Sequence, residues 1–595
     1  MKPGRIEVLI LIKHSIVSLM RFLYVLLLVY CVLSRAESGA EELSVPAWSA
    51  ADMLPVDSGI SMLRYGAFGL GAYPYRHAAP GADIKVYVDG VPLRSFSPFG
   101  PDLELVPPLF GYSPDSGSLD GLNFVMLDEY ENKPVTCTRF LVGPQHRFNF
   151  DVLFKRKVGE KNVIYFDGSS SGIHEKEDTE KNTLRSYYVK YKHLLTAGSS
   201  VDFSIWAFRD RDGLVDLDNR THMGERKTDG VSVSLGLMDY HIGELTGVSA
   251  HCYYQSADSR YDRYGLRKSL SDNTAGVNVT LSTKRGNSEY GLKVLHDIRF
   301  FDSRIHTQSW TRNMTDITSS VKWENSRFRL ALKSGLMYSS KYGEATGIEG
   351  ELVLLGPPEQ EFVIRVLSTD EFPDTGKEYY TSLAFSRNAI VSELEKYNTS
   401  ELEAGLRFIK KHVNLGLYGF ISSSEAPLLG ISTAVQDIRT LSPYSHSTEC
   451  YKGHKNESSG YRIFCDAYVE KQYKCTVMTN FKYRTANLFH RSFTLKTWIY
   501  PPTEFFSHVN LSRNFFSDRL TQTFFGTARY MRWRDWESSP EGNYFFLDVG
   551  ITVKVSSLEL FYKIENATNE EMKWFNTMGW LGRNALWGIT WRFED

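Results

Sequence analysis

The sequence predicts an all-β membrane protein: a large antiparallel transmembrane β-barrel preceded by a small N-terminal domain. The last strand carries the first observation, because one of its faces is apolar and the other is small or polar. The apolar face comprises Trp587, Ile589, Trp591 and Phe593. Such a strand suits lipid on one side and water on the other, and aromatic residues at its end are typical of a membrane interface. The second observation is that the same alternation of apolar and polar residues recurs along most of the chain. The third is that the chain begins with a predicted export signal.

Residues 1–36 are predicted to be a secretory signal peptide. A short apolar run extends from Phe22 to Leu33, and the small residues Ser34 and Ala36 follow it, as a cleavage site requires. Charged residues interrupt the stretch before this run, so no span of about 20 apolar residues is available for a bilayer-crossing helix. Met20 is an alternative start. The signal predicts export from the cytoplasm.

The composition resembles that of a soluble protein, which is expected for a barrel. Hydrophobic residues make up 42% of the chain, and the formal net charge is -2. A barrel has a polar inner face and wet loops, so only the periodicity reveals the membrane. The 68 basic and 70 acidic residues balance, so the chain has no basic surface of the kind that binds nucleic acid. Nucleic acid is therefore excluded as a predicted partner.

Alternating segments follow one another from Thr138 to the end of the chain. Each has apolar residues at every second position and small or polar residues between them, which predicts one strand. The apolar sets include Phe148, Phe150, Val152 and Phe154; Val201, Phe203 and Ile205; Val231, Val233, Leu235 and Leu237; Val277, Val279 and Leu281; Phe328, Leu330 and Leu332; Val413, Leu415 and Leu417; and Leu547, Val549, Ile551, Val553 and Val555. At roughly 20 residues for a strand and its connection, residues 138–595 allow about 22 strands with spans of about 9 to 11 residues.

The predicted connections are of two kinds. Short turns are expected at Arg285–Asn287 and Lys341–Gly343, and longer polar connections at Gly168–Lys181, Ser256–Asn273 and Pro443–Gly460. Short turns at one rim and long loops at the other are typical of an outer-membrane barrel.

Five cysteines remain once Cys31 is removed with the signal peptide. Three of them, Cys450, Cys465 and Cys475, lie close together around a polar stretch. A disulfide that closes an external loop is expected there, because the exported compartment is oxidising. The sequence leaves the pairing among the three open. A metal site is less favoured, since no C-x-x-C pair is present.

The N-terminal region differs from the barrel because it is rich in Gly and Pro. Within it, Asp89–Gly90 is a turn signal that would fold Ile84–Val88 back onto the residues that follow. Four segments resemble, in order, the plug domain of TonB-dependent outer-membrane receptors: Ser49–Leu54, Ser58–Gly66, Asp83–Leu93 and Asp102–Pro107. The segment Leu558–Asn569 and the closing strand resemble the last two barrel strands of the same family.

The resemblance implies a 22-stranded barrel in residues 138–595 whose lumen holds a plug formed by residues 48–137. It also implies a Gram-negative outer membrane and the import of a scarce small-molecule or metal-chelate ligand with energy delivered by TonB. The plug is predicted to be truncated, because the second half of the family's plug is not recognisable between Leu109 and Cys137, where Gly111–Gly121 has the composition of a loop.

Three groups of plug residues are candidate sites. The motif that carries the resemblance is Val88, Asp89, Gly90, Val91, Pro92 and Leu93. An apical loop with aromatic residues spaced by Gly is the candidate for ligand binding, through Arg64, Tyr65, Tyr73, Tyr75 and Arg76, although a structural loop explains it equally well. Residues 37–47 form a predicted periplasmic segment, and within it Glu42, Leu43, Ser44 and Val45 could pair with TonB as an added strand. An unstructured mature terminus is the alternative.

One carboxylate-rich stretch could bind calcium, through Asp210, Asp212, Asp216 and Asp218. A hard cation prefers several oxygens around a sharp turn, but the stretch lacks the bidentate Glu that closes an EF-hand loop. We therefore favour a solvated turn, and no cofactor is predicted. No Ser/His/Asp order, zinc pair or phosphate-binding Gly loop is present to indicate an enzyme.

Three functions remain open from the sequence. The first is a gated receptor-transporter, and the second is a passive porin whose lumen is only narrowed by the plug. An exported β-rich enzyme ranks last, with Asp210 and Asp212 as the residues to test. Predicted luminal charges, namely Asp151, Asp202, Asp548, Arg329 and Lys554, could set the ion preference of a pore or hold a plug.

Overall fold

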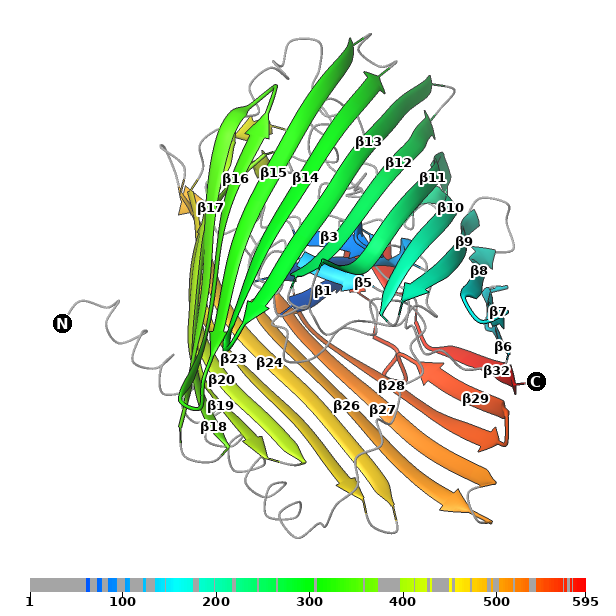
Figure 1. Cartoon of the computed structure of the whole chain (residues 1–595). Coiled ribbons are helices and arrows are strands. Elements are labelled where there is room, and N and C mark those ends of the chain that lie inside the picture. The colour runs from blue at the N-terminus through cyan, green and yellow to red at the C-terminus, as the bar shows by residue number, and fades with distance from the viewer. Residues whose placement is uncertain are drawn as a thin grey trace, which may run out of the picture.

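A computed structural model gives the fold of the chain (Figure 1). In the N-terminal part it describes residues 60–64, 72–76, 84–93, 102–106 and 121–124, and it describes most of residues 134–594. The segments left out of that second range are 145, 175–180, 197, 217–220, 243–245, 264–265, 304–307, 357–358, 373–395, 411, 425–427, 431–448, 452–454, 471–472, 490–493, 496–501, 517–518, 534–541, 571, 575–577 and 581. The predicted signal peptide therefore lies outside the described residues.

Within the described residues, 22 antiparallel strands close a barrel. They are β6 (Val135–Val142), β7 (Phe148–Val158), β8 (Asn162–His174), β9 (Lys181–Thr196), β10 (Ser199–Asp216), β11 (Thr221–Ile242), β12 (Thr246–Arg263), β13 (Leu266–Arg285), β14 (Ser288–Ser303), β15 (Gln308–Glu324), β16 (Phe328–Ser339), β17 (Gly343–Leu355), β18 (Gln360–Glu371), β19 (Tyr397–Lys410), β20 (Val413–Ser424), β23 (Lys455–Glu470), β24 (Lys474–Phe489), β26 (Thr503–Phe515), β27 (Leu520–Trp533), β28 (Gly542–Val555), β29 (Leu558–Glu565) and β32 (Asn584–Glu594). The last strand pairs with the first, so the sheet has no free edge.

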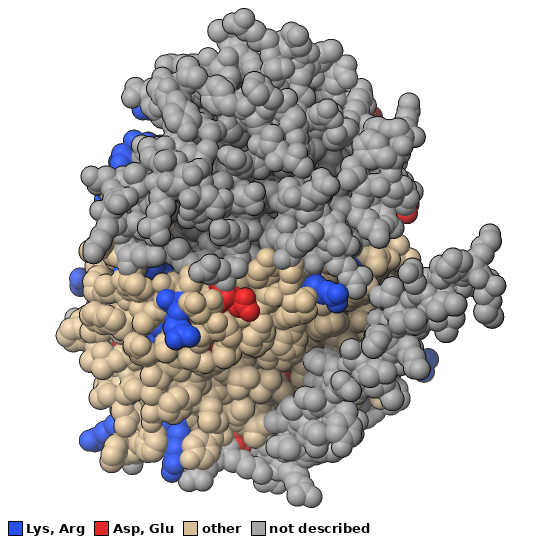
Figure 2. Space-filling model, turned by 180° about the vertical axis from the view of Figure 1, so that it is seen from behind, with Lys and Arg blue, Asp and Glu red and all other residues tan. Residues whose placement is uncertain are grey.

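The outward face of the barrel is apolar. Leu235 in β11 is 54% exposed, whereas the adjacent Ser234 points inward and is 7% exposed. Leu406 in β19 and Trp587 in β32 are exposed in the same way. Figure 2 shows this surface as a belt of mostly uncharged residues, with Lys and Arg near its upper and lower borders. Water would not favour so much exposed apolar surface, and lipid does. The predicted membrane barrel is confirmed.

Several strands continue well beyond the apolar belt. β11 has 22 residues and β13 has 20, although about 10 suffice to cross a bilayer. The predicted connection at Ser256–Asn273 is therefore wrong, because most of it belongs to β12 and β13, which pair as far as Arg263 and Leu266. The predicted connection at Gly168–Lys181 is also too long, since β8 extends to His174. Both turns predicted as short, at Arg285–Asn287 and Lys341–Gly343, are confirmed.

The two rims of the barrel differ. β6 begins and β32 ends at the same rim, where the connections are short, as at Ser556–Ser557. The opposite rim carries the long connections, among them 425–454 and 566–583. In outer-membrane barrels the rim with short turns faces the periplasm and the rim with long loops faces outward. Two short ladders lie within the long connections: β21 (Leu428–Gly430) with β22 (Glu449–Tyr451), and β30 (Met572–Trp574) with β31 (Met578–Trp580). A two-residue strand, β25 (Thr494–Leu495), pairs antiparallel with the last residues of β24.

The N-terminal region forms a small unit inside the ring of strands (Figure 1). β1 (Ile60–Arg64) and β2 (Ala72–Arg76) form a hairpin, and β3 (Lys85–Val88) pairs with β4 (Val91–Pro92) and with β5 (Gly121–Phe124). A single turn of 3-10 helix, η3 (Leu103–Leu105), follows Asp102, whose side chain accepts hydrogen bonds from the amides of Glu104 and Ala72. No helix among the described residues is long and apolar enough to cross a bilayer. We call these described residues, 60–124, the plug.

β5 corrects one prediction. The interval from Leu109 to Cys137 does contain a plug strand, and it pairs in parallel with β3, from Lys85 with Gly121 to Val88 with Phe124. Four residues are too few for a periodic signal, and a parallel partner is distant in sequence.

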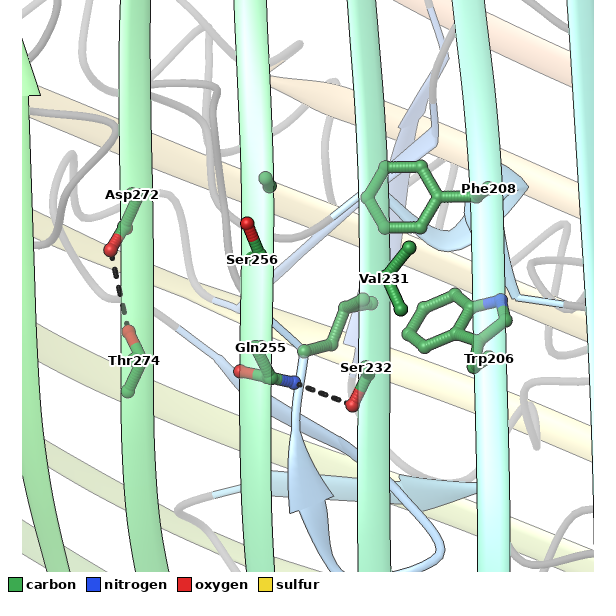
Figure 3. Close-up of a pocket in the computed structure, with 10 residues that line it drawn as sticks. Trp206, Phe208, Val231, Ser232, Gln255, Ser256, Asp272 and Thr274 are labelled. Carbon is green, nitrogen blue, oxygen red and sulfur yellow. Dashed lines mark hydrogen bonds between the residues drawn. The ribbon is translucent and has the colours of Figure 1, made fainter.

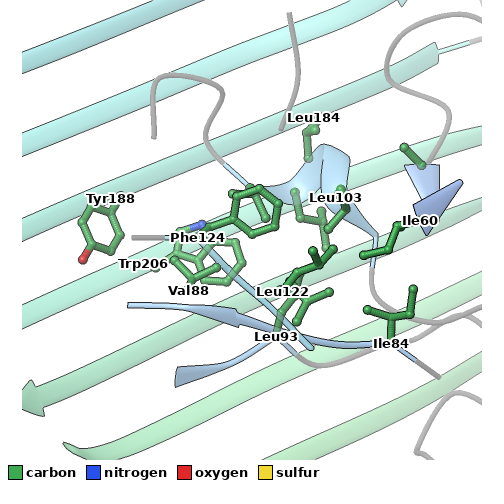
Figure 4. Packing of buried hydrophobic residues seen from close by; sticks show 14 of the residues in the cluster. Ile60, Ile84, Val88, Leu93, Leu103, Leu122, Phe124, Leu184, Tyr188 and Trp206 are labelled. Atoms are coloured by element: carbon green, nitrogen blue, oxygen red, sulfur yellow. The ribbon is translucent and has the colours of Figure 1, made fainter. Parts of the chain in front are cut away.

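The apolar core joins the plug to the barrel wall. Its plug residues include Ile84, Val88, Leu103, Leu122 and Phe124, and its wall residues include Leu184, Tyr188 and Trp206 from β9 and β10 (Figure 4). A core shared in this way would be exposed to the lumen if the plug left, so burial of apolar surface favours the plug inside the barrel.

The cysteine prediction is wrong for two of its three residues. Cys465 lies in β23 and Cys475 in β24, and both are unbonded thiols. The β23–β24 hairpin places Cys465 opposite Thr479 and Cys475 opposite Val469, so the two thiols are several residue pairs apart. The side chain of Cys450 lies outside the described residues.

Candidate functional site

The tip of the β3–β4 hairpin is the best-defined contact between plug and wall. Val88 pairs with Val91, and the two residues between them have positive φ angles, 48° at Asp89 and 75° at Gly90. Positive φ at both positions is typical of a two-residue type I′ hairpin turn, for which Asp-Gly is a favoured sequence. The amide of Asp89 donates to the carbonyl of Phe124 at 2.9 Å. The predicted turn is confirmed.

The Asp89 carboxylate is buried against the wall. It accepts a hydrogen bond from the Tyr188 hydroxyl and lies 3.3 Å from the Lys190 ammonium, both on β9. The same ammonium lies 3.1 Å from a carboxylate oxygen of Asp202 on β10. All four side chains are at least nine-tenths buried. Lys190 is therefore held between a plug carboxylate and a wall carboxylate, where the low dielectric strengthens both attractions.

Amide side chains from the wall bind the backbone of the same turn. Asn278 on β13 donates to the Gly90 carbonyl at 3.0 Å, and Gln255 on β12 donates to the Pro92 carbonyl at 2.9 Å. The His251 ring packs on Gly90 so closely that a Cβ there would lie 3.0 Å from it. Both the positive φ and this close approach favour glycine.

Further contacts hold other parts of the plug. The Lys85 ammonium lies 3.2 Å from Asp316 on β15, and the Lys293 ammonium on β14 lies 4.2 Å from the centre of the Tyr87 ring. On the far side, the Lys482 ammonium of β24 is 3.4 Å from the Ser61 hydroxyl. The described plug thus has polar contacts with strands on two sides of the lumen.

The predicted luminal charges mostly form ion pairs. Asp151 lies 2.6 Å from Arg139, Asp548 lies 3.4 Å from Lys563, and Arg329 pairs with Glu361. Asp202 pairs with Lys190, which also contacts Asp89 of the plug. Lys554 is exposed near the short-turn rim. Such pairing supports the interpretation in which luminal charges hold the wall and the plug together.

The pocket beside the plug is small. It is lined by Leu93 of the plug and by wall residues that include Trp206, Phe208, Gln255 and Asp272 (Figure 3). Its volume of about 20 Å³ has room for one or two water molecules. It is therefore an imperfection in the packing between plug and wall and is too small for a ligand.

The predicted ligand-binding residues lie on the β1–β2 hairpin. Arg64 pairs with Ala72 at the end of the hairpin where residues 65–71 connect the two strands, and Tyr73, Tyr75 and Arg76 follow along β2. Their side chains lie outside the described residues, as does the whole of Tyr65. The same holds for the predicted TonB contact at Glu42, Leu43, Ser44 and Val45.

The predicted turn at Asp210–Asp218 is wrong for its described part. Residues 210–216 belong to β10, where Asp210 pairs with Thr228 and Asp212 with Arg226 of β11. A dense run of Asp residues is compatible with a turn, but the backbone pairs with β11 through this stretch and so continues β10. Asp218 and the side chains of Asp212 and Asp216 lie outside the described residues. Among described side chains, no group of three His, Cys, Asp or Glu residues is arranged to hold a metal.

Sequence reasoning missed the wall residues that bind the plug. Lys190 is buried although Lys is seldom buried, and the signal for it was available. Tyr187, Val189 and Tyr191 alternate with it and face lipid, so Lys190 must face the lumen. The contact of Lys190 with Asp89 could not be predicted from the sequence, because the two residues are far apart along the chain. Tyr188, which also contacts Asp89, is 99 residues away from it.

The fold and this site define a class of protein, a 22-stranded barrel whose lumen holds an N-terminal plug. No protein-family model matches the chain, and no curated protein matches it significantly in sequence. Solved structures do match over almost their whole length. The copper transporter OprC is 11% identical with a TM-score of 0.73, and the match covers 92% of this chain and 97% of that one.

Two further similar structures are transporters or receptors for iron. The FrpB iron transporter from Neisseria meningitidis (F3-3 variant) has a TM-score of 0.69 at 11% identity, with 92% of this chain and 96% of that chain covered. The ferric-catecholate import receptor Fiu from E. coli K12 has a TM-score of 0.66 at 10% identity, with 90% and 93% covered. The chain therefore has the fold of the TonB-dependent receptors.

Proposed function

We propose that this chain is an outer-membrane receptor-transporter that binds a scarce ligand at its outer rim and imports it through the barrel when the plug moves. The buried attachment of the Asp89–Gly90 turn to β9, β10, β12 and β13 is the observation that carries the proposal. A barrel of this size would be a wide pore without an attached plug, and a gated transporter needs a plug that is held until energy is supplied.

The ligand class is proposed from the similar structures. Their names describe transporters of iron and copper and a receptor for a ferric catecholate. A small metal chelate or metal ion is therefore the first class to test. Arg64, Tyr65, Tyr73, Tyr75 and Arg76 remain the proposed plug contacts, since cationic and aromatic side chains suit an anionic chelate.

Energy coupling is proposed through the segment before the plug. Glu42, Leu43, Ser44 and Val45 would pair with TonB as an added strand, in the manner of β-augmentation. No structural calcium is needed for this proposal, and the stretch from Asp210 to Asp218 stays a weak candidate for one.

An uptake experiment tests the transport proposal. The full chain is produced in a Gram-negative host that lacks its own receptors for these ligands, and the uptake of ferric citrate, a ferric catecholate and copper is followed with radiolabelled metal. We expect uptake of at least one, and its loss both in a host without TonB and when residues 41–47 are deleted. Binding to whole cells should survive the deletion, because the outer rim is unchanged.

A conductance experiment separates this proposal from a passive porin. Purified protein in a planar bilayer should show no steady current, because the plug is attached on two sides of the lumen. Steady conductance that TonB does not affect, or uptake that continues without TonB, would instead establish the porin. If the wild-type chain takes up none of the three ligands and shows no steady conductance, the proposed ligand class is rejected, but the proposal that the plug closes the barrel stands.

A further inference from the structure

A second group of buried charges lies on β6, β7 and β8 of the wall, next to β9, whose Tyr188 contacts the plug turn. Asp151 on β7 and Asp167 on β8 both face the lumen, and Arg139 on β6 lies beside Asp151. Asp151 pairs across the strands with Ser169, so Asp167 is its diagonal neighbour on the same face. Diagonal neighbours in a sheet lie roughly 7–8 Å apart, within reach of a group held between two carboxylates.

The charges of this group do not balance. Asp151 and Asp167 are both 0% exposed, and a single guanidinium, that of Arg139, lies 2.6 Å from one oxygen of Asp151. The other oxygen of Asp151 and both oxygens of Asp167 accept no hydrogen bond from any described residue. The side chain of Asn149, two residues along β7 on the same face, is equally buried and has no partner for either of its polar atoms.

Buried ionised carboxylates without partners are strongly unfavourable, so this group must be completed by a cation, a proton or water, because no described residue supplies the missing contacts. Three carboxylate oxygens on one face are suited to a hard cation, which binds carboxylate and amide oxygens together with water. We propose that Asp151 and Asp167 bind a hard metal cation of the calcium class between β7 and β8. The ion would neutralise the excess negative charge and fasten the strands next to the seam, because Arg139 is opposite Thr590 of the last strand.

This site is distinct from the carboxylate run in β10 and goes beyond the proposed transport function. Its oxygens come from two strands, and binding of the cation there is independent of the ligand that the barrel imports. Uptake and ion binding can therefore fail independently.

Ion binding is measured on the full chain, purified in detergent and stripped with a chelator. We expect the stripped protein to take up about one equivalent of Ca²⁺. Terbium, a luminescent substitute for calcium, should show emission excited through nearby tyrosines, because Tyr188 is opposite Asp167 in the sheet. Asp167→Asn should weaken binding at least about tenfold and abolish the luminescence. The control Asp258→Asn changes an exposed carboxylate on β12 and should bind like the wild type.

Thermal unfolding gives a second readout that does not need the variant to bind. Wild-type protein should unfold at a higher temperature with Ca²⁺ than without it. If the unfolding temperature rises with Na⁺ relative to choline but does not respond to Ca²⁺, the site binds a monovalent ion and the assignment to the calcium class is wrong. If no cation binds, and the unfolding temperatures of the wild type and Asp167→Asn do not respond to ions, the carboxyl is protonated or hydrated and the proposal is wrong.

Discussion

Replacing Asp89 with Asn isolates the charge that attaches the plug turn to the wall. Asn tolerates the positive φ of 48° at this position and is favoured in type I′ turns, so the hairpin should keep its shape. The substitution removes the negative charge that faces Lys190 and weakens the acceptor for the Tyr188 hydroxyl. Any weaker attachment of the plug to the wall in this variant is then due to the lost charge and not to a changed turn.

The magnitude follows from what Lys190 retains. Removing one partner of a buried ion pair commonly costs about 3–5 kcal/mol when the other charge is left alone. Here Lys190 keeps Asp202 at 3.1 Å, so the expected loss is that of a hydrogen bond to a charged group, about 1.5–3 kcal/mol. The undocked plug should therefore be about 10 to 150 times more populated in the variant.

Planar-bilayer recording in urea below the unfolding range of the barrel measures this population. An undocked plug opens the lumen, so the fraction of time spent conducting reports the docking equilibrium. Asp316→Asn is the matched control, because it breaks another plug–wall ion pair in which Lys85 is 44% exposed. An exposed pair contributes at most about 1 kcal/mol, so conduction should rise less than about fivefold. Equal effects of the two substitutions, or no effect of Asp89→Asn, would refute the attachment.

Two further substitutions test the turn and the membrane face. Gly90→Ala should increase conduction in the same assay, because it adds about 1–2 kcal/mol of backbone strain at a φ of 75° and places a Cβ 3.0 Å from His251. The control Gly286→Ala changes a glycine that also has a positive φ but has open space around it, and it should not increase conduction. Leu235→Arg should destabilise the barrel by about 2–4 kcal/mol in liposome unfolding experiments if this side chain faces the middle of the bilayer. The control Leu235→Val should have little effect on stability. If the two variants are equally stable, Leu235 faces water.

The barrel could be predicted because its signal is local. Every second side chain meets lipid, so segments such as Val231–Leu237 show their strand and their orientation without knowledge of the partner strands. The plug turn was equally predictable, since Asp89–Gly90 specifies it in two residues.

The parts that were missed depend on distant partners or lack alternation. β12 continues to Arg263 and β13 begins at Leu266, although the sequence from Ser256 to Asn273 is mostly polar and lacks alternation, which is typical of a loop. β5 is short and pairs with a strand more than 30 residues away. The unpartnered oxygens of Asp167 could be recognised only once the neighbouring strands were placed beside it.

A cross-link between plug and wall tests the central claim most directly. Val91 of the plug turn packs with Leu295 of β14, and cysteines at these two positions, in a chain whose native thiols have been replaced, should be joined by a short bifunctional reagent in intact outer membranes. We predict that the link forms in most molecules and that Val91→Cys paired with Leu332→Cys, on the lipid face, does not link. A folded barrel in which the first pair fails to link would contradict a plug docked in the lumen.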